Sequence, residues 1–386
     1  MAVSTRRWRQ WGFGGALLWL LTACSAQSAS PQATHGTVAA ALYQAAVSSE
    51  GEQGEAVNHL FSPISLQRLL AMITAGSAGQ SRDLLLDRFG DSLLKPAHSR
   101  QLQLSEAAFV QQGKALLPEY VKQLQRDYDA EIITVDFSHA TAAATSVNNW
   151  VDKRTGGELR ELLKPEAVKA ETRLLLVATA LLQQQWQVPF MVNLNQRGRF
   201  SNADASQQEV TFMRNTAQFG YLKTEQYQLL QLGFADSTVK LLLMLPAPGE
   251  SLTATTAALL ANPPMAELPL RWVLLHLPRL EIKQHFPLNG ALQAVGVGAL
   301  FTNQANFSRI TGDESLYISD TVHQVRLRFD EQGVSAAAVA AAIFAPKSVP
   351  KLPYHELELH FNRPFAFVMI DTQSREPLFA GSIGKL

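Results

Sequence analysis

The chain has 386 residues, of which 47% are hydrophobic and 17% charged. Its 33 Lys and Arg residues balance its 33 Asp and Glu residues, and this balance argues against nucleic acid as a partner. The length and the hydrophobic fraction suffice for one large buried core. Because no internal repeat or low-complexity linker interrupts residues 38–386, we expect them to form a single domain.

The amino-terminal segment has the layout of an export signal. Arg6, Arg7 and Arg9 precede an apolar run from Trp11 to Leu20, which is too short to span a bilayer comfortably with such flanks. The next four residues, Leu21 to Cys24, resemble the bacterial lipobox, in which a cysteine is acylated and becomes the new first residue. We therefore expect residues 1–23 to be a lipoprotein signal peptide.

Cys24 is the only cysteine of the chain, so a disulfide within the chain is impossible. Lipidation would explain why a cysteine is present at this position. An accidental cysteine after an ordinary signal is the alternative. Residues 24–37, rich in Ser, Ala and Gln, then read as the lipidated residue and a flexible tether. By the same resemblance to bacterial lipoproteins, Ser25 in place of an aspartate favours the outer membrane if the cell is Gram-negative. We expect an exported protein, anchored in the cell envelope through its lipid.

The periodicity of the remaining sequence predicts an α+β protein. Ser65 to Ala75 and Pro118 to Asp127 are apolar at helical spacing and begin with Ser or Pro, which is typical of helices. Apolar runs of the length and composition of buried strands are Arg173–Leu182, Val239–Pro246, Arg271–Leu277 and Phe365–Ile370.

The most unusual stretch follows Asp330. Glu331 and Gly333 lead into Val334 to Ala342, nine residues that carry only small or β-branched side chains and no charge, and Pro346 and Pro350 then flank Lys347–Ser348. As a strand, this stretch would place Val334, Ala336, Ala338, Ala340 and Ala342 on one wholly apolar face. Alanine also favours helices, so a buried helix over Ser335–Ala345 is an equal alternative from this window alone.

Distant segments, taken together with this one, resemble the serpin family of protease inhibitors over about Val38 to Leu386. The matching segments, in order, are Asn58–Ser65 with Leu69–Met72 and Gly76–Ser81, Asn149–Val151 with Thr155–Gly157, Trp186 with Pro189 and Phe190, Val210–Met213, Leu242–Pro246, Leu277–Leu280, and Phe361–Phe365 with Pro377–Gly381. The resemblance implies the serpin fold, with three β-sheets, about eight or nine helices and an exposed reactive-centre loop at about residues 331–351.

It also implies an irreversible suicide-substrate inhibitor, not an enzyme. The protease cleaves the loop, residues 333–345 insert into the main sheet, and the covalently held protease is distorted. The family's hinge corresponds to Glu331, Gly333, Val334, Ser335, Ala336, Ala337, Ala338, Val339 and Ala340, without charge or proline from Gly333 to Ala345. Counting seventeen residues from Glu331 assigns the reactive bond to Lys347–Ser348 and predicts trypsin-like targets. Phe344 is an alternative bait for chymotrypsin-like enzymes, and related cysteine proteases are further candidate partners.

The same resemblance assigns the cluster beneath the opening sheet, called the shutter, and the end where insertion begins, called the breach. These residues are Ser62, Ser65, Thr179, Trp186 and His323. Thr179 is taken to stand where the family has asparagine, so the polar network there must be rebuilt with fewer hydrogen bonds.

Conventional catalytic and metal motifs are missing. His355 and His360 are five residues apart, and their alternation with leucine predicts a strand with the two rings on opposite faces, so we expect no metal site there. No cofactor is expected, and we expect a monomer. Two other functions remain open, a non-inhibitory serpin that acts as a binding or chaperone module and a surface lipoprotein that binds a small ligand.

Overall fold

The computed structural model describes residues 35–50, 57–94, 99–235, 237–286, 288–312, 316–318, 321, 323–334 and 354–386. The predicted signal peptide and Cys24 lie outside these residues. So do Ser335 to Ala340 of the predicted hinge and the predicted reactive bond Lys347–Ser348. Both the strand and the helix interpretation of Ser335–Ala345 therefore stay predictions. Among the described residues, no helix has the length and apolarity that crossing a membrane requires.

The α-helices of the described residues lie mainly in the first half of the chain. Their bounds are α1 His35–Ser49, α2 Pro63–Gly76, α3 Gly79–Phe89, α4 Pro118–Tyr128, α5 Ala140–Arg154, α6 Leu252–Ala261, α7 Leu288–Leu292 and α8 Ser308–Thr311. The sequence predicted α2 and α4. Helix α2 starts at Pro63 because Ser62 caps it, accepting a hydrogen bond from the Ser65 amide. Helix α1 already begins at His35, so His35 to Thr37 are helical, and not tether as expected.

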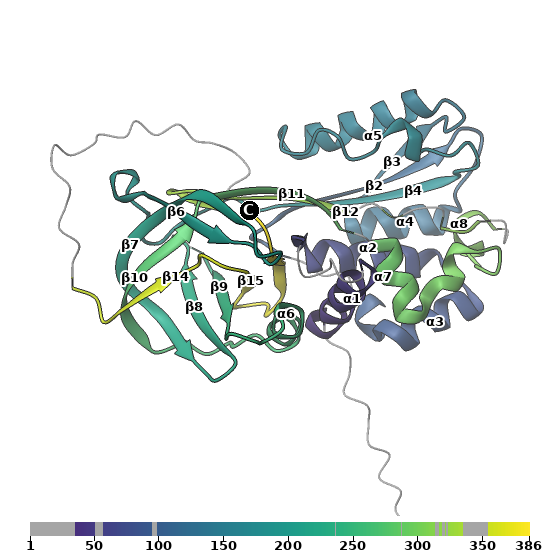
Figure 1. Cartoon of the computed structure of the whole chain (residues 1–386). Coiled ribbons are helices and arrows are strands. Elements are labelled where there is room, and N and C mark those ends of the chain that lie inside the picture. Colours follow the sequence, from purple (N-terminus) through teal and green to yellow (C-terminus); the bar gives the residue numbers. More distant parts are fainter. Residues whose placement is uncertain are drawn as a thin grey trace, which may run out of the picture. The chain divides into compact units, whose positions relative to one another are not determined.

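The strands form three sheets (Figure 1). The largest has the order β1-β16-β15-β9-β8-β7-β10-β14, with β6 also on β7. Its strands are β1 His59–Phe61, β6 Gln196–Ser201, β7 Gln207–Lys223, β8 Tyr227–Gly233, β9 Val239–Pro246, β10 Leu270–Pro278, β14 Leu357–His360, β15 Phe365–Asp371 and β16 Pro377–Ile383. The second has the order β3-β2-β4, from β2 Gln103–Gln111, β3 Glu131–Val135 and β4 Leu174–Leu181.

The third sheet has the order β11-β12-β13-β5, from β5 Gln184–Gln185, β11 Leu280–Phe286, β12 His323–Phe329 and β13 Gly333–Val334. The predicted strands are confirmed as β4, β9, β10 and β15, and the leucine and histidine alternation before His360 forms β14. The apolar runs of β9 and β15 were readable because both faces of these two strands are buried almost throughout.

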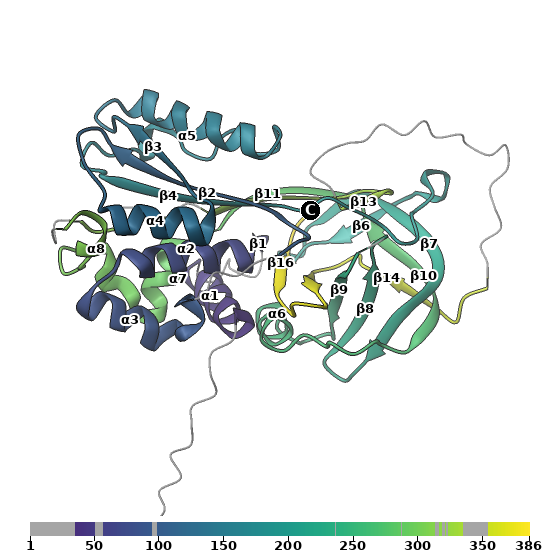
Figure 2. The same ribbon diagram turned by 180° about the vertical axis from the view of Figure 1, so that it is seen from behind.

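The strand β4 illustrates how the helices cover the second sheet. Leu175 and Val177 pack in a cluster with α5, whereas Leu174 and Leu176 pack toward α2, since successive side chains of a strand point to opposite faces. Figures 1 and 2 show α5 on one side of β2, β3 and β4, and α2 and α4 on the other. A further apolar cluster joins the third sheet to the largest one.

The second and third sheets are parted along most of the boundary between β4 and β12. These two strands come close to each other, yet within the described residues no backbone ladder joins them. Only at one end is the boundary closed, where β13 pairs with both β12 and β5, and β5 follows β4 after two residues. We call this boundary the slot. It positions the candidate functional site.

Candidate functional site

The first inserting residue of the predicted hinge already lies in the sheet. Val334 pairs with Phe329 of β12 on one side and with Gln184 of β5 on the other, both in antiparallel register. Its side chain is 2% exposed and belongs to the apolar cluster that joins the third sheet to the largest one. A valine is suited to this position because it is apolar and β-branched. Gly333 and Val334 of the predicted hinge therefore close one end of the slot.

Gly333 owes its place to close packing. A β-carbon at this residue would lie 2.0 Å from the carbonyl oxygen of Gln184, far inside van der Waals contact. Gly333 is not among the residues with positive φ. The sequence analysis expected a hinge glycine, and the structure supplies its reason: only glycine lets β13 approach the backbone of β5.

The turn before the hinge is held by Asp330 and Trp186. The Asp330 carboxylate accepts hydrogen bonds from the amides of Gln332 (2.9 Å) and Gly333 (3.2 Å). The indole Nε1 of Trp186 donates to the Asp330 carbonyl oxygen at 2.7 Å, and the Trp186 amide donates to the Gln332 carbonyl oxygen at 2.9 Å. Trp186 thus holds the turn between β12 and β13 through two hydrogen bonds.

Glu331 is the charged member of the predicted hinge, and it is 6% exposed. Asn195 Nδ2 donates to its carboxylate at 2.6 Å, and Arg279 Nη1 lies 4.0 Å from the same oxygen. Its carbonyl oxygen accepts a hydrogen bond of 2.9 Å from the Phe190 amide. A buried carboxylate needs such partners. Glu331 therefore holds the turn between β12 and β13 in place.

Three of the predicted shutter residues come together at the start of α2. The Ser62 amide donates to His323 Nε2 at 3.0 Å, and the Ser62 hydroxyl donates to the Leu378 carbonyl oxygen at 2.8 Å. Because His323 Nε2 accepts, the ring carries its neutral-state proton on Nδ1. The Ser65 hydroxyl is buried and has no hydrogen-bond partner in the part of the chain that the structure describes.

Thr179 does not belong to this cluster, which corrects the sequence assignment. Its hydroxyl donates to the Ser105 carbonyl oxygen at 3.2 Å, inside the second sheet. Strand alternation puts Thr179 on the same face as Val177, which α5 covers, and Ala178 on the α2 face. The residue of β4 that faces the shutter is thus Ala178. Its methyl group offers no hydrogen bond, which is consistent with the unpartnered Ser65 hydroxyl.

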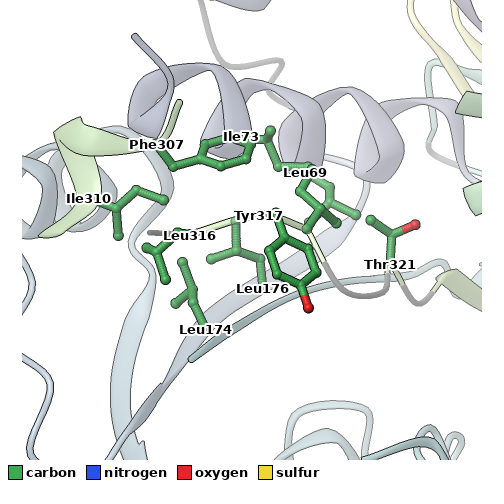
Figure 3. A pocket seen from close by; sticks show the side chains of 10 residues that line it. Leu69, Ile73, Leu174, Leu176, Phe307, Ile310, Leu316, Tyr317 and Thr321 are labelled. Carbon is green, nitrogen blue, oxygen red and sulfur yellow. The ribbon is translucent and has the colours of Figure 1, made fainter. Parts of the chain in front are cut away.

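A small, mostly apolar cavity of about 50 Å³ lies between β4 and α2 (Figure 3). Leu174 and Leu176 of β4 line one wall, and Leu69 and Ile73 of α2 line another. The remaining lining residues are Phe307, Ile310, Leu316, Tyr317, Ile318 and Thr321. Apolar side chains around a void lack the dispersion contacts that close packing would give them. The described side chains thus leave the β4 side of the slot incompletely packed.

The second and third sheets thus meet without a backbone ladder among the described residues, except at one end, where Gly333 and Val334 of the predicted hinge bridge β12 and β5. The sequence model of the family described as "Serpin (serine protease inhibitor)" matches residues 33–385. The chain therefore belongs to the serpin family.

Named relatives agree with this membership. The chain is 27% identical over 354 residues to Iripin-5 of Ixodes ricinus, covering 85% of this chain and 89% of that protein. It is 27% identical over 352 residues to plasminogen activator inhibitor 1 of Neovison vison, covering 84% and 86%. The solved structure titled "Cleaved Serpin 42Da" matches with a TM-score of 0.75 at 23% identity, covering 91% of this chain and 99% of that one, and confirms the fold.

Sequence reasoning missed several residues of the site. Asp330 and Asn195 hold the base of the loop, but each is a lone polar residue without a motif of its own. Ala178 was missed because Thr179, its neighbour on the strand, was taken as the residue that faces α2. The alternation within Leu174 to Leu181 was the available signal, since a one-residue slip moves a side chain to the other face.

Proposed function

We propose that the protein is an irreversible suicide-substrate inhibitor of serine proteases with trypsin-like specificity, cleaved at Lys347–Ser348. The observation that carries this proposal is the insertion of Gly333 and Val334 between β12 and β5 at the head of an otherwise open slot. After cleavage the loop would continue into that slot as a full strand. The attached protease would be carried with it.

The register of the inserted residues supports this path. Val334 lies opposite Gln184 and Phe329. If the ladder continues in steps of two residues, Ala338 falls opposite Ala180 and Val325, and Ala340 opposite Ala178 and His323. Even-numbered loop residues then face the core, as Val334 does. Ala340, whose side chain is a single methyl group, would then lie at the buried shutter beside His323.

The same register supports a source of free energy for insertion. Ala342 would fall opposite Leu176 and Thr321, which both line the cavity in Figure 3. Insertion would cover these apolar side chains and add a ladder along β4 and β12. Each covered 100 Å² of apolar surface is worth roughly 2.5 kcal/mol. The uncleaved chain would thus be trapped short of its most stable packing.

Lys347 is the basis of the proposed specificity. A lysine before the cleaved bond enters a pocket with an acid at its base, as in trypsin-like enzymes. Phe344 is the alternative bait, for chymotrypsin-like proteases. Among the relatives, the proteins named plasminogen activator inhibitor 1 and leukocyte elastase inhibitor carry inhibitory names.

A second candidate function is a non-inhibitory serpin that binds a ligand or partner. The structure titled "thyroxine-binding globulin complex with thyroxine" shares the fold with a TM-score of 0.76 at 22% identity. The absence of charged residues from Gly333 to Ala345 speaks for inhibition, because a charge among inserting residues would have to be buried. We also propose, from the sequence alone, a monomer anchored in the envelope through lipidated Cys24.

The test mixes residues 33–386 with trypsin and follows the reaction on a denaturing gel, with mass spectrometry of the released peptide. This span is chosen because it contains the whole family match, residues 33–385. A heat-stable covalent band and a peptide beginning at Ser348 are expected. Complete cleavage with trypsin still active would overturn inhibition in favour of the binding function.

Two variants test separately the recognition of Lys347 by the protease and the insertion of the cleaved segment. Lys347→Glu is expected to abolish reaction with trypsin, because the charge no longer fits the pocket. Ala340→Glu should still be cleaved at Lys347 but should release active trypsin, because the proposed register buries this carboxylate beside His323. A covalent band from Ala340→Glu as strong as that of the parent chain would contradict the proposed insertion.

A further inference from the structure

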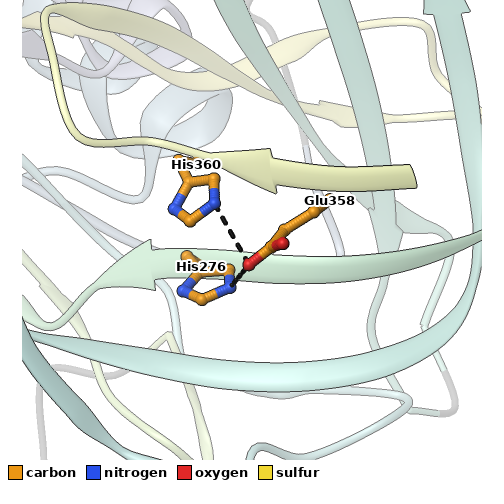
Figure 4. A group of neighbouring side chains, drawn as sticks. All are labelled: His276, Glu358 and His360. Atoms are coloured by element: carbon orange, nitrogen blue, oxygen red, sulfur yellow. Dashed lines mark ion pairs between the residues drawn. The ribbon is translucent and has the colours of Figure 1, made fainter. Parts of the chain in front are cut away.

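Three side chains with metal-binding atoms meet on the largest sheet, away from the slot (Figure 4). His276 lies on β10, and Glu358 and His360 lie on β14. His276 is directly opposite His360 in the parallel ladder, and Glu358 is two residues before His360, so all three point to one face. Figure 4 shows the two rings and the carboxylate turned toward one another.

The distances suit a common ligand. His276 Nε2 is 2.7 Å and His360 Nε2 is 3.2 Å from the same oxygen of Glu358. The two rings stack with centroids 4.0 Å apart. In a tetrahedral zinc site, with bonds of about 2.0–2.2 Å, ligand atoms stand about 3.3 Å from one another. Small side-chain rotations would therefore bring the three atoms to coordinating positions.

The geometry points to a binding site for a divalent transition metal ion of the zinc class, with His276, Glu358 and His360 as ligands. Two imidazoles and one carboxylate form a ligand set that zinc accepts in proteins, with a further position open to water. The ligands combine one buried ring with two half-exposed groups, their side chains being 7%, 43% and 45% exposed. An ion can thus enter from solvent and still meet a ligand fixed in the core.

His276 is the buried member of the three. Burial, followed by the charges of His360 and Arg214, lowers the pKa of His276 to about 4. In the metal-free protein its Nε2 lies at hydrogen-bond distance from Glu358. Metal binding would replace this contact.

Arg214 sets a limit on the affinity. It lies on β7 directly opposite His276 and contributes a repulsive charge to that ring. Its Nε atom is buried and has no hydrogen-bond partner among the described residues. A fixed positive charge beside the ligands opposes a divalent cation, so removing it should tighten binding by about tenfold. Removal of the Arg214 charge is therefore a control that should raise the metal affinity, whereas removal of a ligand should lower it.

Sequence reasoning overlooked this cluster because it examined the histidines of residues 355–360 alone. His276 joins them only through the pairing of β10 with β14. A bound ion would link β14, the first described strand after Val334, to β10, and so add a fixed point to an edge strand of four residues. The proposal does not depend on protease inhibition.

The experiment titrates residues 33–386, with any affinity tag removed, with Zn²⁺ by calorimetry and with Co²⁺ by visible absorption. We expect one ion per chain, a Co²⁺ spectrum of four- or five-coordinate type, and a higher thermal unfolding midpoint with Zn²⁺. His360→Gln and Glu358→Gln should each lose at least tenfold in affinity. Both residues are half-exposed, so these variants should fold, which circular dichroism without metal would check.

His355→Gln is the matched control, because His355 precedes the same strand but lies outside the cluster, and it should bind as the parent chain does. Arg214→Gln should bind Zn²⁺ more tightly. Equal binding by the parent chain, His360→Gln and Glu358→Gln would indicate an adventitious surface ion, for example at His139 and Asp136, and would overturn the proposal. So would loss of binding in His355→Gln, or no binding at all.

Discussion

The indole Nε1 of Trp186 donates a hydrogen bond of 2.7 Å to the carbonyl oxygen of Asp330, the residue at which the chain turns from β12 toward the hinge. Trp186 also stacks on Phe234, with ring centroids 5.0 Å apart. One side chain therefore joins the apolar core to the base of the loop. The turn between β12 and β13 is thus hydrogen-bonded to a tryptophan that stacks on a second aromatic ring.

This contact predicts the effect of Trp186→Phe. The substitution keeps an aromatic ring but leaves the Asp330 carbonyl oxygen without its donor, which should lower stability by about 1–3 kcal/mol. The urea unfolding midpoint measures the loss. Trp272→Phe on β10 is the control, since that ring is 36% exposed, and it should change the midpoint little. Equal effects of the two changes would contradict the importance of the turn.

Gly333→Ala tests whether the hinge is inserted. The added β-carbon would lie 2.0 Å from the Gln184 carbonyl oxygen, so the pairing of β13 with β5 should break. Hydrogen exchange should then accelerate at the Trp186 amide, which bonds the Gln332 carbonyl oxygen. Gly298→Ala is the control, because the nearest heavy atom to its β-carbon is 3.8 Å away. Unchanged exchange in Gly333→Ala would mean that the hinge lies outside the sheet in solution.

Substitution of Ser62 and of Ser65 by alanine should affect the stability of the protein differently. Ser62→Ala removes the N-cap of α2 and the bond to Leu378, so we expect it to cost about 1–2 kcal/mol. Ser65→Ala removes a buried hydroxyl that has no partner among the described residues, and it should be neutral or stabilising. Thermal unfolding of both variants measures the difference. A loss in Ser65→Ala as large as in Ser62→Ala would reveal a partner for that hydroxyl.

Much of the fold was readable because its signals are local. The buried strand β9 is a continuous apolar run, and its predicted bounds, Val239 to Pro246, are those of the structure. Helix α2 carries its own start signal in Ser62 and Pro63. The family resemblance then placed Trp186 and Glu331 at the base of the loop.

What the sequence did not predict depends on pairing between distant strands. That Ala178 and not Thr179 faces the shutter follows from which side of β4 lies on α2. The meeting of His276 with His360 follows from the parallel register of β10 and β14. A local pattern gives the alternation of a strand, but its neighbour and its register are set by the rest of the core.

The cavity beside Leu176 predicts a trade between stability and insertion. Leu176→Phe should fill part of the 50 Å³ void, and at about 24 cal/mol per Å³ the gain is at most about 1 kcal/mol. The uncleaved protein should therefore unfold at a higher temperature. Because less packing would remain to be gained on insertion, more inhibitor should be cleaved without trapping trypsin. Differential scanning calorimetry and the molar ratio needed for full inhibition measure the two effects.

Leu175→Phe is the matched control for this substitution. Leu175 neighbours Leu176 on β4 but points to the α5 face, where it is 6% exposed in a closely packed cluster. The larger ring should overpack that cluster and lower the unfolding temperature, since added volume in a filled core typically costs about 1–3 kcal/mol. A stabilising effect of Leu175→Phe would contradict the role of the cavity in the stability change. If Leu176→Phe stabilises the protein but traps trypsin with unchanged efficiency, the cavity does not contribute to the proposed free energy of insertion.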